Sequence, residues 1–143
     1  GTLSGLAEKV LGITNMREFD RMAMAGNTNR VDLTIGDFVE MHGQLAADLT
    51  ASNLARRNPG ATAEDWAAGL ATLIFQVVGT MCLLACRGCG AKGVVVTGAI
   101  ADTAPSRANF ARFVEGYGLN YFVPEHSACS TAIGTALCAR YAK

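Results

Sequence analysis

The sequence predicts a single α/β domain over residues 1–143, with short parallel strands packed against helices. The run Val94-Val95-Val96-Thr97-Gly98 is β-branched and ends in glycine, which is typical of a strand buried on both faces. Residues 119–123 form a second short strand pattern that Pro124 stops. Helical patterns precede, separate and follow these two runs. The order helix–strand–helix–strand–helix is that of an α/β unit with parallel strands.

The composition is that of a folded chain without a charge bias. Of its 143 residues, 50% are hydrophobic and 17% are charged, and 12 Lys and Arg balance 12 Asp and Glu. Disordered chains combine low hydrophobicity with high net charge, and this chain has neither. A protein that binds nucleic acid through its phosphates needs a basic excess, and aromatic residues make up only 7% of the chain. We therefore expect no nucleic-acid partner.

The first quarter of the chain predicts two short helices. Apolar residues recur on one face from Leu3 to Leu11, and Gly12 is suited to end that helix. Asn15 can cap a second helix, with Glu18 three residues later as in a capping box. This helix is expected to stop at Gly26-Asn27.

The next segment is mixed. Residues 31–39 alternate like a strand, but Gly36-Asp37 interrupts the pattern. Residues 48–53 are polar, which predicts a loop or a helix start. Residues 56–62 contain Asn58-Pro59-Gly60, a clear break between elements.

A long uncharged helix dominates the middle of the chain. Thr62 and Asp65 are placed to open it, and it is expected to run to about Arg87. The 21 residues from Trp66 to Cys86 carry no charge, which meets the length criterion for a membrane span. The flanks, however, lack aromatic belts and a Lys/Arg cluster, and the run contains Gln76 and two glycines. A buried core or subunit-interface helix is therefore preferred, with no membrane partner.

The last two helices are predicted from their starts and their composition. Pro105 fits the first turn of a helix that runs to Gly116. Residues 127–142 form a final helix rich in alanine and glycine.

The cysteines indicate a reducing compartment. Their number is odd, and no secretory signal precedes them, so we expect reduced thiols in a cytoplasmic protein. Cys86 and Cys89 form a C-x-x-C pair that closes a helix, and no second pair is spaced to complete a zinc site. We expect no metal site. Because residue 1 is Gly and runs directly into a helical pattern, the chain is expected to be a fragment whose upstream part is missing.

Three segments are candidate ligand sites. In open α/β sheets, ligands bind beyond the carboxyl ends of the strands, where Thr97-Gly98-Ala99 and residues 125–128 fall. Residues 1–5 lie at a helix start, where backbone N–H groups suit a phosphate. Taken alone, each of the first two segments is better explained as an ordinary strand-to-helix turn or helix cap.

No catalytic constellation is evident. His42 is expected at the surface, and His126 follows Glu125 without a nucleophile in a hydrolase-like context. Asp32, Asp37 and Asp48 offer carboxylates, but roles as solvated caps explain them equally well. The sequence has no P-loop.

Four segments in order are similar to motifs of one kinase family. Residues 1–14 resemble the segment that follows its second Gly-rich phosphate loop, and residues 94–98 its strand and glycine at the adenosine. Asp48-Leu49-Thr50-Ala51-Ser52-Asn53 is similar to D-L-T-A-[AS]-N-F-G, with Leu54-Ala55 in place of Phe-Gly. Residues 125–134, EHSACSTAIG, resemble E-N-G-A-F-S-G-A-I-G. Together they resemble the carboxyl-terminal half of the type II (eukaryotic-like) pantothenate kinases, of the acetate and sugar kinase and actin superfamily.

The resemblance implies a two-lobed, ribonuclease H-like or actin-like ATPase fold, of which this chain is the carboxyl-terminal lobe. It implies ATP and Mg²⁺ in a cleft between lobes, pantothenate as substrate in the first step of coenzyme A synthesis, and a homodimer formed through the helix at residues 64–87. Gly1 and Thr2 would end the second phosphate loop, and Gly98 and Ala99 would approach the adenosine. The family often has Ser where this chain has Ala99.

The resemblance also implies what this chain lacks. The first phosphate loop and the carboxylate taken as general base belong to the amino-terminal lobe, so no catalytic residue is assigned here and the fragment alone is expected to be inactive. Alternatives are another sugar kinase or an activator ATPase of the same superfamily, and a non-catalytic dimerisation module. A small membrane protein is the least favoured.

Overall fold

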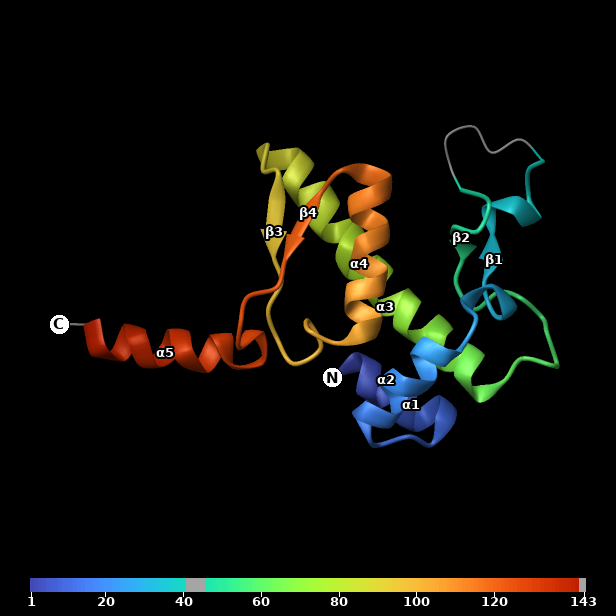
Figure 1. Ribbon diagram of the computed structural model, residues 1–143, viewed down its shortest axis with the longest axis horizontal. Helices are drawn as coiled ribbons and strands as arrows, with labels where there is room; N and C mark the ends of the chain where they lie inside the picture. Colours follow the sequence, from blue (N-terminus) through green and yellow to red (C-terminus); the bar gives the residue numbers. More distant parts are fainter. Residues whose placement is uncertain (41–45, 142–143) are drawn as a thin grey trace. The chain divides into compact units, whose positions relative to one another are not determined.

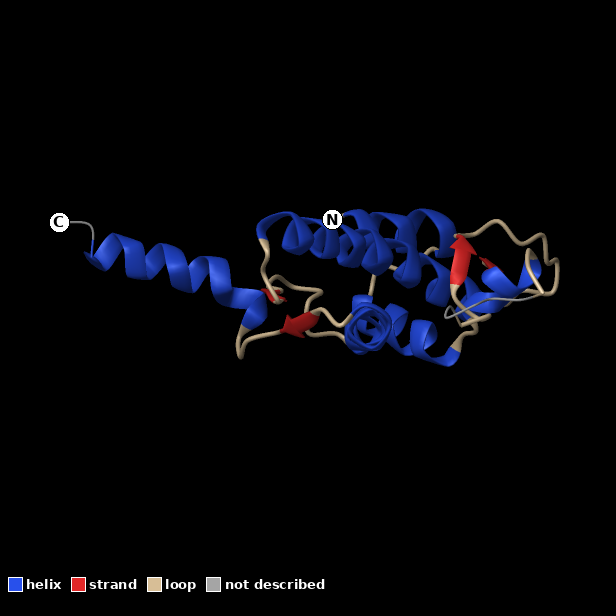
Figure 2. Cartoon of the chain, turned by 90° about the horizontal axis from the view of Figure 1, so that it is seen from above, coloured by secondary structure: helices blue, strands red, loops and turns tan. Residues whose placement is uncertain are grey.

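The chain is a mixed α/β protein, as the sequence predicts. The computed structural model describes residues 1–40 and 46–141 (Figure 1), so His42 and the predicted end of the last helix at Ala142 lie outside the described residues. Within the described ranges there are five α-helices and two small two-stranded sheets, one of them parallel. Helices form most of this part of the chain, and the strands are short (Figure 2). The chain divides into two compact units, residues 1–78 and 79–143, and the division falls within one helix.

The two amino-terminal helices form where predicted because their ends are encoded locally. α1 (Thr2–Leu11) ends at Gly12, whose φ of 70° allows its N–H to reach the carbonyl oxygens of Ala7 and Glu8. α2 (Met16–Ala25) begins at Asn15, whose side chain accepts a hydrogen bond from Arg17 N at 3.0 Å. Phe19 of α2 is fully buried in the first unit.

A small antiparallel strand pair follows the 3-10 turn η1 (Thr28–Arg30), and a second 3-10 turn, η2 (Ile35–Asp37), comes directly after its first strand. β1 (Leu33–Thr34) pairs antiparallel with β2 (Thr50–Ser52). The expectation of a loop or helix start at residues 48–53 is therefore wrong for Thr50–Ser52, whereas the residues on either side of the strand form turns. Backbone pairing with a distant segment fixes Thr50–Ser52 as a strand, and Ile35 N donating to Leu49 O at 2.8 Å extends that pairing.

α3 (Ala63–Cys89) is the long apolar helix, and its start is fixed by a reciprocal cap. Thr62 N donates to Asp65 Oδ2 at 2.9 Å, and Asp65 N donates to Thr62 Oγ1 at 3.3 Å. In the first unit α3 buries residues on one face. These are Ala67, Ala68, Leu70, Ala71 and Phe75.

Among the helices of the described ranges, only α3 is long and apolar enough to cross a membrane. Its most apolar 18-residue window has a mean hydropathy of 2.0, and 44% of that window is buried within the protein. Core helices of soluble proteins pass the same test.

The second unit contains the parallel strands predicted by the sequence. β3 (Gly93–Val95) and β4 (Asn120–Phe122) pair in parallel, joined by α4 (Ala104–Tyr117). Thr103 caps α4, Pro105 lies in its first turn, and Gly118 closes it with a φ of 65°. β4 leads through a 3-10 turn, η3 (Ser127–Cys129), into α5 (Ser130–Tyr141).

The expectation that the first strand is buried on both faces is wrong. Val94 and Tyr121 pack against the buried side chains of Leu83 and Cys86 on α3, whereas Val95 is 65% exposed and Phe122 is 62% exposed. Side chains alternate along a strand, and the helices of this unit cover only one face of the pair.

Tyr121, on the covered face of this small sheet, contacts two helices. Its ring stacks on Phe110 of α4, with centroids 4.6 Å apart, and its hydroxyl donates to Gly79 O of α3 at 3.0 Å. Burial raises the pKa of Tyr121 to about 12, so the hydroxyl remains a donor at physiological pH. A Cβ at position 79 would lie 2.5 Å from the ring of Phe113, so only glycine fits there.

Asp65 provides a test of the reciprocal cap. Although burial acts to raise its pKa, the N–H groups of Thr62 and Asn27, the Thr62 hydroxyl and the Arg30 guanidinium hold the pKa below the usual 3.8. A depressed pKa stabilises the fold above the unfolded-state value, and that contribution is lost as pH falls through the folded-state pKa.

Asp65→Asn is therefore expected to lower the free energy of unfolding by about 2 kcal/mol at pH 7. Its deficit relative to the parent should shrink as pH falls below 4, because the unfolded parent, whose Asp65 pKa is higher, then takes up the proton first and is favoured over the folded state. Urea unfolding followed by circular dichroism at pH 7 and pH 3 measures both values. Glu64→Gln removes the same charge from the same helical turn and is the control; an equal loss in both variants would assign the effect to the helix dipole instead of the cap.

Candidate functional site

Two of the candidate segments meet at the carboxyl ends of the parallel strands. Gly98 N donates to Ser127 O at 2.9 Å. One step earlier, Val96 N donates to Phe122 O at 2.9 Å, so the backbone pairing continues beyond β3 and β4. The segment after the first strand and the segment after the second therefore lie side by side, at the edge where open α/β sheets bind ligands.

Gly98 is required here by its backbone conformation. Its φ is 114°, a region that side chains rarely adopt, and a Cβ built at this position meets no atom within 4 Å. The space beside the Gly98 backbone is open and not filled by packed side chains. Ala101 N donates to Gly98 O at 3.1 Å and closes the turn, and Ala99 is exposed on it.

The second segment is a tight turn held by its own backbone. His126 has a φ of 58°, and Ser127 N donates to Pro124 O at 3.1 Å while Cys129 N donates to His126 O at 2.8 Å. Ser127 is only 3% exposed. The start of α5 is thereby fixed next to Gly98.

Gly1 and Thr2, the other predicted site residues, belong to the first unit. Gly1 precedes α1 and makes no side-chain cap, and Gly1 O accepts from Ser4 Oγ at 2.8 Å and from Gly5 N at 2.9 Å. Gly98 and Ala99 belong to the second unit. The fold thus brings Gly98 together with the segment at Ser127, and it places Gly1 and Thr2 together at the start of α1.

Asp32, which the sequence offered either as a candidate carboxylate or as a solvated cap, is buried in the first unit, so the solvated cap is wrong. Asp32 is fully buried, and its side chain accepts hydrogen bonds from Leu54 N at 2.7 Å and from Thr50 Oγ1 at 2.9 Å. Asn53 Nδ2 lies 3.4 Å from the same carboxylate and donates to Gln76 Oε1 at 3.0 Å. Two residues of the motif that resembles D-L-T-A-[AS]-N, Thr50 and Asn53, therefore contact the Asp32 carboxylate.

The two aspartates of this region differ in their electrostatics. Burial raises the pKa of Asp32, and its hydrogen bonds with Leu54, Thr50 and Asn53 offset this only in part. Asp37 is a cap, because it accepts from Thr34 N at 2.7 Å and Thr34 Oγ1 at 2.9 Å; these bonds and its ion pair with Arg56 lower its pKa. The hydrogen bonds that the Asp32 carboxylate accepts come from Thr50, Asn53 and Leu54 of the same unit, so Asp32 stabilises the β1–β2 pair.

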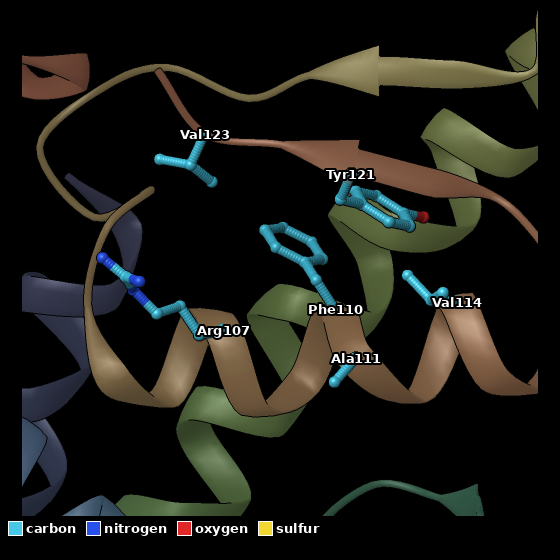
Figure 3. A pocket seen from close by; sticks show the side chains of 6 residues that line it. All are labelled: Arg107, Phe110, Ala111, Val114, Tyr121 and Val123. Atoms are coloured by element: carbon cyan, nitrogen blue, oxygen red, sulfur yellow. The ribbon is translucent and has the colours of Figure 1, made fainter. Parts of the chain in front are cut away.

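A cavity of about 310 Å³ lies between α4 and the strand β4 with its continuation (Figure 3). Figure 3 shows Arg107, Phe110, Ala111 and Val114 on the helix and Tyr121 and Val123 on the strand side. Arg107 is the only charged side chain in this lining, and it pairs with Asp102. The cavity is therefore largely apolar and its one charge is balanced.

The cysteines are free thiols. Cys86 is buried, Cys82 is half-buried, and Cys89, Cys129 and Cys138 are exposed. Burial raises the pKa of Cys82, which disfavours a reactive thiolate. Within residues 1–40 and 46–141, no three His, Cys, Asp or Glu side chains are grouped to hold a metal ion.

Comparisons with known proteins add no relative. No family model matches the chain, and no curated protein matches it significantly.

Proposed function

We propose that this chain is the nucleotide-binding, carboxyl-terminal lobe of a type II pantothenate kinase, with the ribonuclease H-like or actin-like ATPase fold. The observation that carries the proposal is the pairing of Gly98 with Ser127 beside open space. The motifs at residues 94–98 and 125–134 resemble the same family, and the fold brings them together.

The geometry at Gly98 suits a purine nucleotide. A glycine with open space in front of it lets the face of a ligand approach the backbone, where no side chain intervenes. We assign Gly98 and Ala99 to the adenosine of ATP. Gly1 and Thr2, the cap and the first residue of α1, are assigned to the end of a phosphate loop, because backbone N–H groups at a helix start favour negative charge.

The remaining parts of the reaction are assigned to the other lobe. Phosphoryl transfer depends on positioning and charge neutralisation. The described residues of this chain do not form a carboxylate group suited to Mg²⁺. The Mg²⁺ ligands, the pantothenate pocket and the general base are therefore placed in the amino-terminal lobe, and this chain positions the nucleotide. The proposed protein is cytoplasmic, and its substrates are ATP and pantothenate.

An exposed apolar stripe on α3 supports dimerisation through the helix at residues 64–87. Val77, Met81 and Leu84 recur at helical spacing and are 51%, 66% and 62% exposed. Large apolar side chains that gather in this way on a surface mark an interaction site. The same stripe favours the second candidate function, a non-catalytic dimerisation module. Nucleotide binding separates the two.

The first prediction concerns Gly98. Gly98→Ala is expected to weaken ATP binding about tenfold, because the new methyl group enters the open space and the φ of 114° becomes strained. Titration of ATP into ¹⁵N-labelled chain, followed by the amide signals of Gly98, Ala99 and Ser127, measures the affinity.

Two variants complete this experiment. Gly90→Ala carries a comparable strain, at a φ of 73° with open space, away from the candidate site and should leave ATP affinity unchanged. Ala99→Ser adds the hydroxyl that the family often has and should tighten binding about threefold to tenfold, the effect of one hydrogen bond. Equal weakening by Gly98→Ala and Gly90→Ala, or no ATP-dependent shift at all, would remove the nucleotide site.

The second prediction concerns turnover. The 143-residue chain, incubated with ATP, Mg²⁺ and pantothenate, is expected to form no phosphopantothenate above background, because it lacks the residues that hold the metal and accept the proton. A coupled ADP-release assay measures this. Pantothenate-dependent turnover by this chain would contradict the half-enzyme proposal.

The third prediction concerns self-association. Leu84→Glu places a charge in the α3 stripe and is expected to shift the chain from dimer toward monomer in sedimentation velocity. Val114→Glu makes the same change at an exposed apolar position of α4 and should leave the distribution unchanged. A parent chain that is monomeric at high micromolar concentration would remove this interface.

A further inference from the structure

A second cavity, also of about 310 Å³, lies at the amino ends of the parallel strands, within the second unit. β3 begins at Gly93 and β4 at Asn120, so this edge of the sheet is opposite to the one where Gly98 and Ser127 meet. The residues that line the cavity come from the last turns of α3, the end of α4 and the segments that lead into the two strands. The cavity is therefore distinct from the candidate nucleotide site.

Backbone hydrogen bonds hold the two turns that border this cavity. α3 and α4 each lead into a glycine with left-handed backbone, Gly90 with a φ of 73° and Gly118 with a φ of 65°. Ala91 N donates to Cys86 O at 3.0 Å, and Gly118 N donates to Val114 O at 2.9 Å. The shape of the cavity therefore follows from the way both helices end.

The inner wall of the cavity is apolar and continuous with the core of the unit. Leu83, Cys86 and Leu119 line it, and these residues form one buried cluster. The Cys86 thiol donates to Gly93 O at 3.7 Å, so it is used within the fold. Tyr117 adds an aromatic ring to the lining. A ligand that enters here needs an apolar body, and an aromatic one suits the wall.

Two cations, Arg87 and Lys92, line the same cavity, and none of the described residues around it is acidic. Neither cation forms an ion pair within residues 1–40 and 46–141, where the ion pairs join Arg30, Arg56 and Arg107 to aspartates. The carboxyl ends of α3 and α4 each act as about half a negative charge. Two full positive charges exceed both helix ends by about one elementary charge, so the cavity suits a ligand with one negative charge.

We propose that this cavity binds a small monocarboxylate with an apolar, aromatic body. Its volume holds about ten non-hydrogen atoms at roughly 30 Å³ each. Arg87 offers the carboxylate parallel N–H donors, Lys92 adds a second positive charge, and the body of the ligand contacts the apolar wall. A phosphate dianion fits less well, because its second charge is not balanced beside two helix carboxyl ends. The site does not depend on the kinase proposal.

A set of matched probes tests the ligand class on the unmodified chain. Phenylacetate has the required size and charge, phenylacetamide has the same shape without the charge, and acetate has the charge without the body. Titration into ¹⁵N-labelled chain, followed by the amide signals of Lys92, Gly118 and Asn120, measures each affinity. Phenylacetamide and acetate are each expected to bind about tenfold more weakly than phenylacetate. Equal affinity for phenylacetate and phenylacetamide, or tighter binding of inorganic phosphate, would overturn the proposal.

Variants of the two cations test the place of binding. Arg87→Gln is expected to weaken phenylacetate binding about tenfold and to leave phenylacetamide binding unchanged, because only the charged ligand loses a charge-assisted bond. Lys92→Gln, outside the helix, should weaken it about threefold. Arg140→Gln removes the same charge from the last turn of α5, as Arg87→Gln does from α3, and should change neither affinity. Equal phenylacetate affinities of Arg87→Gln and Arg140→Gln would overturn the proposal.

Discussion

The backbone hydrogen bond from Gly98 to Ser127 holds together the two segments that follow the parallel strands of the second unit. β3 and β4 have only three residues each, and a parallel pair of that length has few ladder bonds of its own. The Val96–Phe122 and Gly98–Ser127 bonds extend the pairing past both strands, and they place two turns at one edge of the sheet. The direction of α5 follows from the same constraint, because η3 starts at the bonded residue.

Tyr121 provides the second constraint on this unit. A two-stranded parallel sheet needs packing from outside, and this one residue contacts α4 through ring stacking and α3 through its hydroxyl. The close approach of Phe113 to Gly79 shows that the helices meet with little space to spare. The covered face of the sheet is therefore well packed, and the opposite face has no layer.

The elements that the sequence predicted correctly are those whose ends are chemically encoded nearby. Gly12, Asn15, the Thr62–Asp65 pair and Pro105 each act within one helical turn, so their effect is visible in a local pattern. β2 was missed because it depends on pairing with a distant strand. The exposure of Val95 was also missed, because a β-branched run predicts a strand but does not show how many layers cover it.

In the candidate site, too, the sequence predicted only the features that a local pattern encodes. Gly98 stood out because a glycine at the end of a strand has a physical reason to be there. The Asp32 network was not predicted, although a signal exists: Asp32 lies between the alternating apolar residues Val31 and Leu33, and Thr50 and Asn53 supply donors some twenty residues later. Only the fold shows that these donors converge on one carboxylate.

The start of α3 has a spectroscopic consequence. The single tryptophan, Trp66, lies in the first turns of that helix, within the first unit, whereas Tyr117, Tyr121 and Tyr141 all belong to the second. Indole emission therefore reports on one unit and phenol absorbance on the other. Energy transfer from the tyrosines to Trp66 therefore reports the distance between the two units without an added label.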